Sequence, residues 1–423
     1  MNTVTKPAYQ KEFTMVDTSQ IIPVLVGTDV NIYGMARSFH EAYGVKSHCI
    51  GVAALAMTKD SQICDVTVVD HFKENKEFVA ALLDMAKKYG KPGVKPILIT
   101  AGDEYTELAI RNRAALEETY IIPYPSVKVL DSVYYKDHFY QQCEENHLPY
   151  PKTVVVNQEN YEQKVADLKL AFPVAMKPAD AAQQIAMDFP GQRKAYKFTA
   201  KEQILTMLKR TYDAGYRGNF LLQDFIPGGD TAMYTINFYA DLDSNVRQMT
   251  MGRQLLQDPS DFLVGNYVAT FIEYHQDIEA RLAKFIKNMG YTGFGNFDLK
   301  YDVRDQEFKL IELNPRQGRS GFYTTASGHN LIKPMVEDRV FHQPFTAPEL
   351  AKNDYLWLGV NPDDAVANVT DPEIKKHMQT LIDAGKWGNT LEYPADKSFL
   401  RNHRIKKYYA SYKARFAAKN EGK

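Results

Sequence analysis

Residues 296–319, NFDLKYDVRDQEFKLIELNPRQGR, have the pattern of a β-hairpin. The turn falls at 303–306, VRDQ. The strand before it carries Asp298, and the strand after it ends in Glu312 and Asn314. Two carboxylates and an amide oxygen on adjacent strands are hard oxygen ligands, which suit Mg²⁺ bound together with nucleotide phosphates. An ordinary hairpin whose acidic residues face solvent fits the same stretch equally well.

The period of a β-strand predicts the faces of this hairpin. Side chains alternate across a strand, so Glu312 and Asn314 are expected on one face, with Phe308 and Leu310 upstream on the same face. The hairpin alone does not decide between a metal site and surface decoration.

Length and composition are those of a globular protein of two or three domains. The chain has 423 residues, 44% hydrophobic and 24% charged, which is ordinary for this class. A formal net charge of −1 argues against a nucleic-acid-binding protein, which usually has a basic domain. The three cysteines have no CxxC spacing, and they indicate a reducing compartment without a disulfide framework or a zinc site.

The sequence predicts a cytoplasmic location. Residues 1–20 are polar, lack the apolar segment of a secretory signal and are expected to form a flexible tail. No apolar run approaches the roughly 18 residues that span a bilayer.

Residues 21–125 alternate between strands and helices. The first helix is expected to have Asp29 or Asn31 as its cap, and a second is expected to end at Gly90. Strands are expected at 21–27, 46–51, 66–69, 96–100 and 120–122. This alternation predicts a parallel, doubly wound sheet, and the absence of GxGxxG argues against a dinucleotide site.

Two lysines lie on predicted elements in the next segment. Lys136 lies on a polar helix, and Lys177 ends a short strand in the extended geometry that Pro178 imposes. Such a lysine is more often a surface residue than a ligand contact. Residues 179–194 have little pattern and are expected to form a mobile loop.

Beyond Phe345 the pattern weakens, and the chain ends in a basic, amphipathic stretch. From Lys397 onwards, the lysines and arginines are opposed by a single acid, Glu421. Three interpretations compete: a terminal helix packed on the core, a dock for an anionic substrate, and a contact with a membrane surface.

The order of these features resembles that of the ATP-grasp superfamily. A doubly wound domain is followed by two lysines, a hinge strand at 222–227 (LQDFIP), Asp230, and the hairpin with ELNPR at 312–316, the most specific motif. The resemblance covers residues 21–345 and implies an α/β and α+β fold. The implied parts are a flexible tail at 1–20, a doubly wound pre-ATP-grasp domain at 21–125, an ATP-grasp domain at 126–345 with a small lid subdomain at about 126–220 and a larger subdomain at about 221–345, and a C-terminal extension with a basic helix at 346–423.

Several stretches are similar to the D-aspartate ligases of Gram-positive bacteria, and this similarity spans nearly the whole chain. They are VLVGTDVNIYGMARSFHEAYG at 24–44, LPYPKT at 148–153, QDFIPG at 223–228, YTGFGNFDLKYDVRD at 291–305, LNPRQGRSGF at 313–322 and EDRVF at 337–341. The resemblance implies an ATP-dependent carboxylate–amine ligase. Such an enzyme activates the β-carboxylate of D-aspartate as an acyl phosphate and joins it to the lysine ε-amine of the peptidoglycan stem peptide, supplied as a UDP-linked or lipid-linked muramyl pentapeptide.

The resemblance also implies roles for individual residues. Asp298, Glu312 and Asn314 would hold Mg²⁺, as two ions that bridge the phosphates of ATP. Arg316 and Arg319 would grip the substrate carboxylate or stabilise an oxyanion. The implied nucleotide contacts are Lys136 and Lys177 to the phosphates, Gln223, Asp224, Phe225 and Ile226 around adenine, and Asp230 to the ribose.

Two departures from the ATP-grasp pattern concern the nucleotide. Residues 179–194 contain only one glycine where many members have a glycine-rich loop, so Arg193, Lys194 and Lys197 become candidate phosphate contacts. Gln223 stands where a glutamate is common, which puts an acidic contact to adenine in doubt.

Two alternatives to this function stay open. One is an ATP-grasp ligase for another amino acid or a dipeptide, and the other is a non-catalytic, nucleotide-binding regulatory protein. The metal and lysine candidates count against the second, because a degenerate site is expected to lose its ligands first. No nucleic-acid partner is implied. A peripheral contact of the basic helix with the inner face of the membrane stays one of the three interpretations of that stretch.

Overall fold

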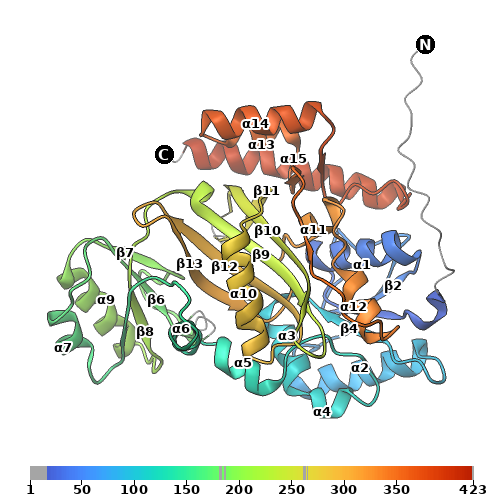
Figure 1. The fold of residues 1–423 in the computed structure, drawn as a ribbon, viewed down its shortest axis with the longest axis horizontal. Coiled ribbons are helices and arrows are strands. Elements are labelled where there is room, and N and C mark those ends of the chain that lie inside the picture. Colours follow the sequence, from blue (N-terminus) through green and yellow to red (C-terminus); the bar gives the residue numbers. More distant parts are fainter. Residues whose placement is uncertain (1–16, 181–182, 185–186, 261–262, 264, 422–423) are drawn as a thin grey trace.

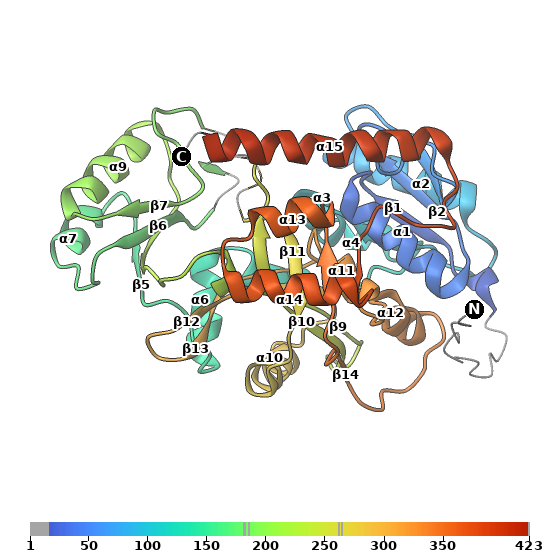
Figure 2. The same ribbon diagram turned by 90° about the horizontal axis from the view of Figure 1, so that it is seen from above.

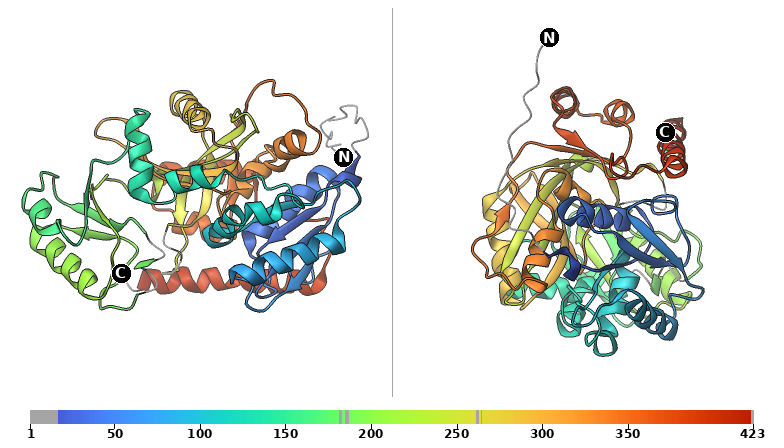
Figure 3. Two further views of the ribbon diagram at one scale, coloured as in Figure 1. Left: turned by 90° about the horizontal axis from the view of Figure 1, so that it is seen from below. Right: turned by 90° about the vertical axis from the view of Figure 1, so that its right-hand side faces the viewer.

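The computed structural model describes residues 17–421 apart from 181–182, 185–186, 261–262 and 264, so most of the expected N-terminal tail lies outside the described residues. Three sheets organise the fold, and the central one lies between the other two (Figure 1). The last helices of the chain lie across this arrangement (Figures 2 and 3). Within the described residues, no helix is long and apolar enough to cross a membrane.

The N-terminal sheet is parallel, as predicted, with the strand order β3-β2-β1-β4. Its elements are β1 (Pro23–Val26), β2 (Ser47–Gly51), β3 (Cys64–Val68), β4 (Ile97–Thr100), α1 (Val30–Tyr43), α2 (Asn75–Tyr89), α3 (Gly102–Arg111) and α4 (Arg113–Leu116). The strand expected at 120–122 is wrong, because Ile121 forms only one isolated bridge with Ile97. The chain then turns at Pro123, which has no amide hydrogen to extend a ladder.

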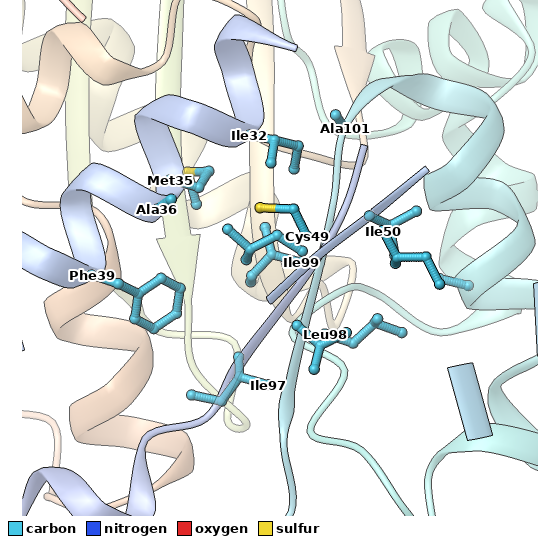
Figure 4. Packing of buried hydrophobic residues seen from close by; sticks show 14 of the residues in the cluster. Ile32, Met35, Ala36, Phe39, Cys49, Ile50, Ile97, Leu98, Ile99 and Ala101 are labelled. Carbon is cyan, nitrogen blue, oxygen red and sulfur yellow. The ribbon is translucent and has the colours of Figure 1, made fainter. Parts of the chain in front are cut away.

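Helix α1 packs on this sheet through Ile32, Met35 and Phe39, which recur at helical spacing and point at the strands (Figure 4). Asp29, rather than Asn31, caps the helix, since its carboxylate accepts a hydrogen bond from the Ile32 amide at 3.1 Å. The first turn of α1 is thereby held at the carboxyl edge of the sheet, where α/β folds bind ligands.

The small sheet is antiparallel, with the order β5-β8-β6-β7. Its strands are β5 (Thr153–Val156), β6 (Val174–Pro178), β7 (Tyr196–Phe198) and β8 (Phe220–Asp224), and its helices are α7 (Tyr161–Ala166) and α9 (Lys201–Asp213). One face packs on these helices through residues such as Met176 and Leu222. Strand alternation turns Lys177 and Leu221 to the other face, where Leu221 joins the core of the central sheet.

The central sheet has eight strands in the order β13-β12-β9-β10-β11-β15-β16, with β14 paired to β10. The strands are β9 (Met233–Ala240), β10 (Val246–Gln257), β11 (Tyr267–Ile272), β12 (Gly293–Asp302), β13 (Glu307–Asn314), β14 (Glu349–Leu350), β15 (Leu356–Leu358) and β16 (Trp387–Gly388). The accompanying helices are α5 (Val127–Val133), α6 (Lys136–Glu145), α10 (Gln276–Asn288), α11 (Phe322–Ala326) and α12 (Ile332–Arg339).

The predicted hairpin is β12 and β13, with its turn at 303–306. One expectation about its faces is wrong. A β-bulge at Ile311 shifts the register, so that Asp298 pairs with Glu312 while Leu299 pairs with Leu310. The extra residue reverses the alternation, and Leu310 therefore packs in the core while Glu312 faces the opposite side.

The chain beyond residue 345 is part of the same fold. Strands β15 and β16 extend the central sheet, and three helices follow as α13 (Pro362–Asn368), α14 (Pro372–Asp383) and α15 (Phe399–Glu421). Helix α15 runs from the N-terminal sheet towards the small sheet (Figure 2). Its apolar residues Ile405, Tyr409, Tyr412 and Phe416 are buried, which agrees with the interpretation of a helix packed on the core.

A buried ion pair fixes the start of α15 to the N-terminal sheet. Arg401 is fully buried, and its guanidinium lies 3.8 Å from the ring centroid of Tyr33 and 3.3 Å, measured from Nε, from Oδ2 of Asp396. Asp396 also accepts hydrogen bonds from the hydroxyls of Tyr33 and Ser61 and from the amide of Gln62. Every oxygen of this carboxylate is therefore satisfied by groups far away in sequence.

Asp396→Asn is expected to lower the free energy of unfolding by about 3–5 kcal/mol, because it leaves the buried Arg401 charge without its counter-ion. Urea unfolding of the intact chain measures this loss. The matched control is Arg404→Met. Arg404 also lies on α15, and its substitution breaks a more exposed salt bridge to Asp60, which should cost under about 1 kcal/mol. Equal effects of the two variants would contradict a structural role for the buried pair.

Candidate functional site

A cavity of 1310 Å³ lies between the small sheet, the central sheet and α15. Its wall contains the lysine, metal and arginine candidates that the sequence predicts. These are Lys136, Lys177, Asp298, Glu312, Asn314, Arg316 and Arg319. The cavity wall also includes Val30, from the first turn of α1, and Asp103, from the first turn of α3, so helices of the N-terminal sheet border the same space.

Two carboxylates face each other at one end of this cavity. Asp298 on β12 and Glu312 on β13 are cross-strand neighbours, and their side chains are hydrogen-bonded. Burial, and then the nearby Glu312 charge, raise the pKa of Asp298 well above its usual range. The charge of Lys136 lowers the pKa of Glu312 to about 2. Burial and charge therefore drive the two pKa values apart, so that ionisation is disfavoured at Asp298 and favoured at Glu312.

These residues fit a divalent cation. Two neighbouring carboxyl groups on adjacent strands can offer oxygen ligands to one ion, and Asn314 adds an amide whose Nδ2 lies 3.3 Å from Oδ2 of Asp298. Within the described part of the chain, no group of three or more His, Cys, Asp or Glu residues could hold a metal by itself. Mg²⁺ is commonly bound by one or two carboxylates plus phosphates of the substrate, so two acids suffice.

Two lysines bring positive charge to the carboxylate pair. Lys136 is the first residue of α6, and its Nζ lies 3.1 Å from Oε2 of Glu312. Lys177 comes from the small sheet, where burial and then the charge of Lys136 lower its pKa to about 8. The negative charges therefore come from the central sheet, and one of the opposing positive charges comes from the small sheet.

The two arginines differ in how strongly they are engaged. Arg316 donates from Nε to Oδ1 of Asp103 at 2.7 Å and from Nη2 to Oδ1 of Asn314 at 3.3 Å. Arg319 has one ion pair, in which Nη1 lies 3.9 Å from Oδ2 of Asp258, and it donates no closer hydrogen bond to any described residue. Arg319 is therefore the guanidinium that can receive a ligand without giving up a bond.

The predicted adenine and ribose residues do not lie in the wall of this cavity. Gln223 donates from its amide to the Thr153 hydroxyl at 2.9 Å. The ring of Phe225 lies beside two ammonium groups, with Nζ of Lys197 at 4.3 Å and Nζ of Lys300 at 5.4 Å from its centroid.

The two acidic candidates, Asp224 and Asp230, also bind groups of the protein itself. Asp224 forms an ion pair with Arg304, and Asp230 accepts a hydrogen bond from the Gln257 amide at 3.0 Å. The adenine and ribose roles of residues 223–226 and Asp230 stay predictions.

Sequence reasoning missed several residues of the site. Asp103 lies in the first turn of α3, directly after β4, at the edge where parallel sheets bind ligands, and this placement was a usable signal. Asp258, Tyr408 and Tyr412 come from a strand end and from the last helix, and no local pattern links them. Of the expected loop contacts, Arg193 and Lys194 line the cavity, although part of the loop at 179–194 lies outside the described residues.

Comparison with known proteins identifies the family. No family model matches the chain. The D-aspartate ligase of Enterococcus faecium (strain Aus0004) is 38% identical over 411 residues, which cover 95% of this chain and 97% of that protein. The chain belongs to the D-aspartate ligase family. This membership confirms the ligase class expected from the sequence and favours it over a non-catalytic protein.

Solved structures show the ATP-grasp fold. The biotin carboxylase domain of Hydrogenobacter thermophilus 2-oxoglutarate carboxylase, in complex with MgADP and bicarbonate, matches with a TM-score of 0.58 at 15% identity, covering 77% of this chain and 71% of that one. N5-carboxyaminoimidazole ribonucleotide synthetase from Thermus thermophilus matches with a TM-score of 0.57 at 16% identity, covering 81% and 83%. The predicted α/β and α+β fold is thereby confirmed.

Asp298→Asn is expected to abolish the stabilisation that Mg²⁺ adds in the presence of ADP. For the unsubstituted protein this gain is about 1.4 kcal/mol at a Mg²⁺ concentration ten times its Kd, measured by thermal unfolding. Without metal, the variant should unfold at about the same temperature, because the asparagine amide can still donate a hydrogen bond to Glu312. Asp305→Asn, in the exposed turn of the same hairpin, is the control and should keep the full Mg²⁺ effect. A Mg²⁺ response retained by Asp298→Asn would refute the metal assignment.

Proposed function

We propose that the protein is an ATP-dependent ligase that activates the β-carboxylate of D-aspartate as an acyl phosphate and joins it to the lysine ε-amine of the peptidoglycan stem peptide. The observation that carries the proposal is the set of side chains that line one cavity. They are two lysines, a carboxylate pair and a guanidinium that is free for a ligand. D-aspartate is the acid in the name of the Enterococcus faecium relative. The stem peptide is implied by the sequence resemblance.

The lysines and carboxylates would form the phosphate end of the site. Lys136 and Lys177 supply point charges for the phosphates of ATP, and Asp298, Glu312 and Asn314 supply hard oxygen ligands for Mg²⁺. When bound, the metal supplies the charge that stabilises phosphoryl transfer.

The arginines would act on the acid substrate. Arg319 is free to bind a carboxylate in the bidentate geometry that suits a guanidinium. Arg316 is held by Asp103 and touches the metal candidate Asn314, so it is placed to stabilise negative charge on the reacting carboxyl group.

The proposed reaction has two steps. An oxygen of the β-carboxylate attacks the γ-phosphorus of ATP, ADP leaves, and an acyl phosphate remains. The neutral ε-amine then attacks the acyl carbon, phosphate leaves with the bonding electron pair, and the nitrogen loses a proton to give the amide. The side chains contribute by positioning and by fixed charge rather than by covalent participation.

The amine substrate would be a UDP-linked or lipid-linked muramyl pentapeptide. A lipid-linked precursor would bring the protein to the inner face of the membrane. The exposed lysines Lys406, Lys407 and Lys413, on the outer side of α15, are the predicted contact with its anionic surface.

The proposal is tested by ADP release in the presence of hydroxylamine, which traps an activated carboxyl group as a hydroxamate. D-aspartate is expected to give ADP and hydroxamate in equal amounts, and L-aspartate, D-glutamate and D-alanine much less. Adding the muramyl pentapeptide in place of hydroxylamine should give a product linked at the lysine side chain, seen by mass spectrometry. Hydroxamate from another acid alone would refute D-aspartate and keep the ligase, and no ADP release with any acid would refute the ligase itself.

The affinity for MgATP is expected to fall by about tenfold between pH 7 and pH 9. Lys177 has a pKa of about 8, so it is mostly charged at pH 7 and mostly neutral at pH 9, and only the charged form attracts phosphate. Calorimetry with a non-hydrolysable ATP analogue measures this change. Lys177→Met should bind more weakly at pH 7 and show little change up to pH 9. The same pH dependence in the variant would assign the titration to another group.

A further inference from the structure

The last helix closes one part of the cavity. Tyr408 and Tyr412 on α15 line the wall together with Arg319. Both tyrosines lie one helical turn apart, so they share a face of α15 that is turned into the protein. The 23-residue helix thus does more than cover the core, because it places two hydroxyl groups in the site.

The hydroxyls form a hydrogen-bonded chain with a definite direction. The hydroxyl of Tyr412 donates to Oδ2 of Asp258 at 2.7 Å, since an ionised carboxylate only accepts. Its single proton is then used, so in the 3.0 Å contact between the two tyrosines Tyr408 must be the donor. The oxygen of Tyr408 is left with free lone pairs, and it can accept a hydrogen bond from a ligand.

The same carboxylate is shared with the unengaged arginine. Oδ2 of Asp258 lies 3.9 Å from Nη1 of Arg319, while its other oxygen, Oδ1, accepts from the Ser260 amide at 3.0 Å. Asp258 is buried, so its charge depends on these partners. Tyr412 therefore holds Asp258 in a position that balances the charge of Arg319 without saturating its donors.

Several nearby groups affect the pKa of Arg319. Burial opposes its charge, but Tyr408, Tyr412, Asp29 and Asp258 outweigh that effect and raise its pKa. The Arg319 guanidinium and the Tyr408 hydroxyl therefore line the same cavity, and Asp258 and Tyr412 connect the two. This combination of a cation for a carboxylate and acceptors for an ammonium is complementary to a zwitterion.

We propose that the Arg319 end of the cavity binds the zwitterionic head of the amino-acid substrate, with Arg319 on the α-carboxylate and the Tyr408 oxygen on the α-ammonium group. Tyr412 is a positioning residue that keeps Asp258 from pairing fully with Arg319. The assignment rests on the proposed function, because it takes an amino acid as the activated substrate. It makes the C-terminal helix a determinant of substrate selection.

The test compares Tyr412→Phe with Tyr120→Phe, using acid-dependent ADP release with hydroxylamine as the amine. Tyr412→Phe frees Asp258 to pair with Arg319, so the KM for D-aspartate should rise by about fivefold to tenfold, the effect of losing one hydrogen bond, with kcat and the KM for ATP little changed. The control is Tyr120→Phe, which removes a buried hydroxyl that donates to the Leu82 carbonyl away from the cavity, and it should leave all three constants unchanged.

Two further variants separate this role from a general weakening of the fold. Adding Asp258→Asn to Tyr412→Phe neutralises the competing carboxylate and should bring the KM for D-aspartate back towards the original value, which a merely structural defect would not do. Tyr408→Phe should reduce the preference for D-aspartate over succinate, which lacks the ammonium group. Thermal unfolding of each variant verifies the fold.

The outcomes distinguish this proposal from the proposed function. If the unsubstituted protein uses D-aspartate and Tyr412→Phe keeps its KM, the zwitterion pocket is refuted and the ligase stands. If another amino acid is the substrate, the D-aspartate assignment fails, and the same KM comparison with that amino acid decides the pocket. No turnover with any amino acid overturns both.

Discussion

The buried carboxylate pair of Asp298 and Glu312 is the constraint on which the site depends. Two acids on neighbouring strands repel each other, and burial makes ionising both of them costly. The protein compensates by placing Lys136 at 3.1 Å from Glu312 and Lys177 close by. These lysines come from a helix start and from another sheet, so the charges balance only when the small and central sheets are assembled.

A single inserted residue determines which side chains reach this cavity. The bulge at Ile311 places Glu312 opposite Asp298 while leaving Leu310 in the core beside Leu299. The Tyr140 hydroxyl satisfies the backbone at the bulge by donating to the Ile311 carbonyl at 2.8 Å. Without the bulge, strict alternation would put Leu310 and Glu312 on one face, and either a leucine or the carboxylate would be in the wrong environment.

The C-terminal region completes the central sheet and contributes to the cavity wall. Its strands extend the central sheet, and the buried pair of Arg401 and Asp396 fixes α15 to the N-terminal sheet. This attachment places Tyr408 and Tyr412 in the wall of the cavity that Arg319 also lines, although the two segments are far apart in the sequence. The apolar side of the basic helix is used inside the protein, while its lysines stay on the outside.

The sequence by itself determined the parallel N-terminal sheet, the hairpin and the metal and lysine candidates, because alternation, helical spacing and motif order are local properties. Its resemblance to D-aspartate ligases agrees with the family that the comparisons identify. Only the tertiary structure decided the bulge at Ile311, the engagement of Arg316 by Asp103 and the freedom of Arg319. These features depend on contacts between segments far apart in the chain, and no local pattern encodes such distances.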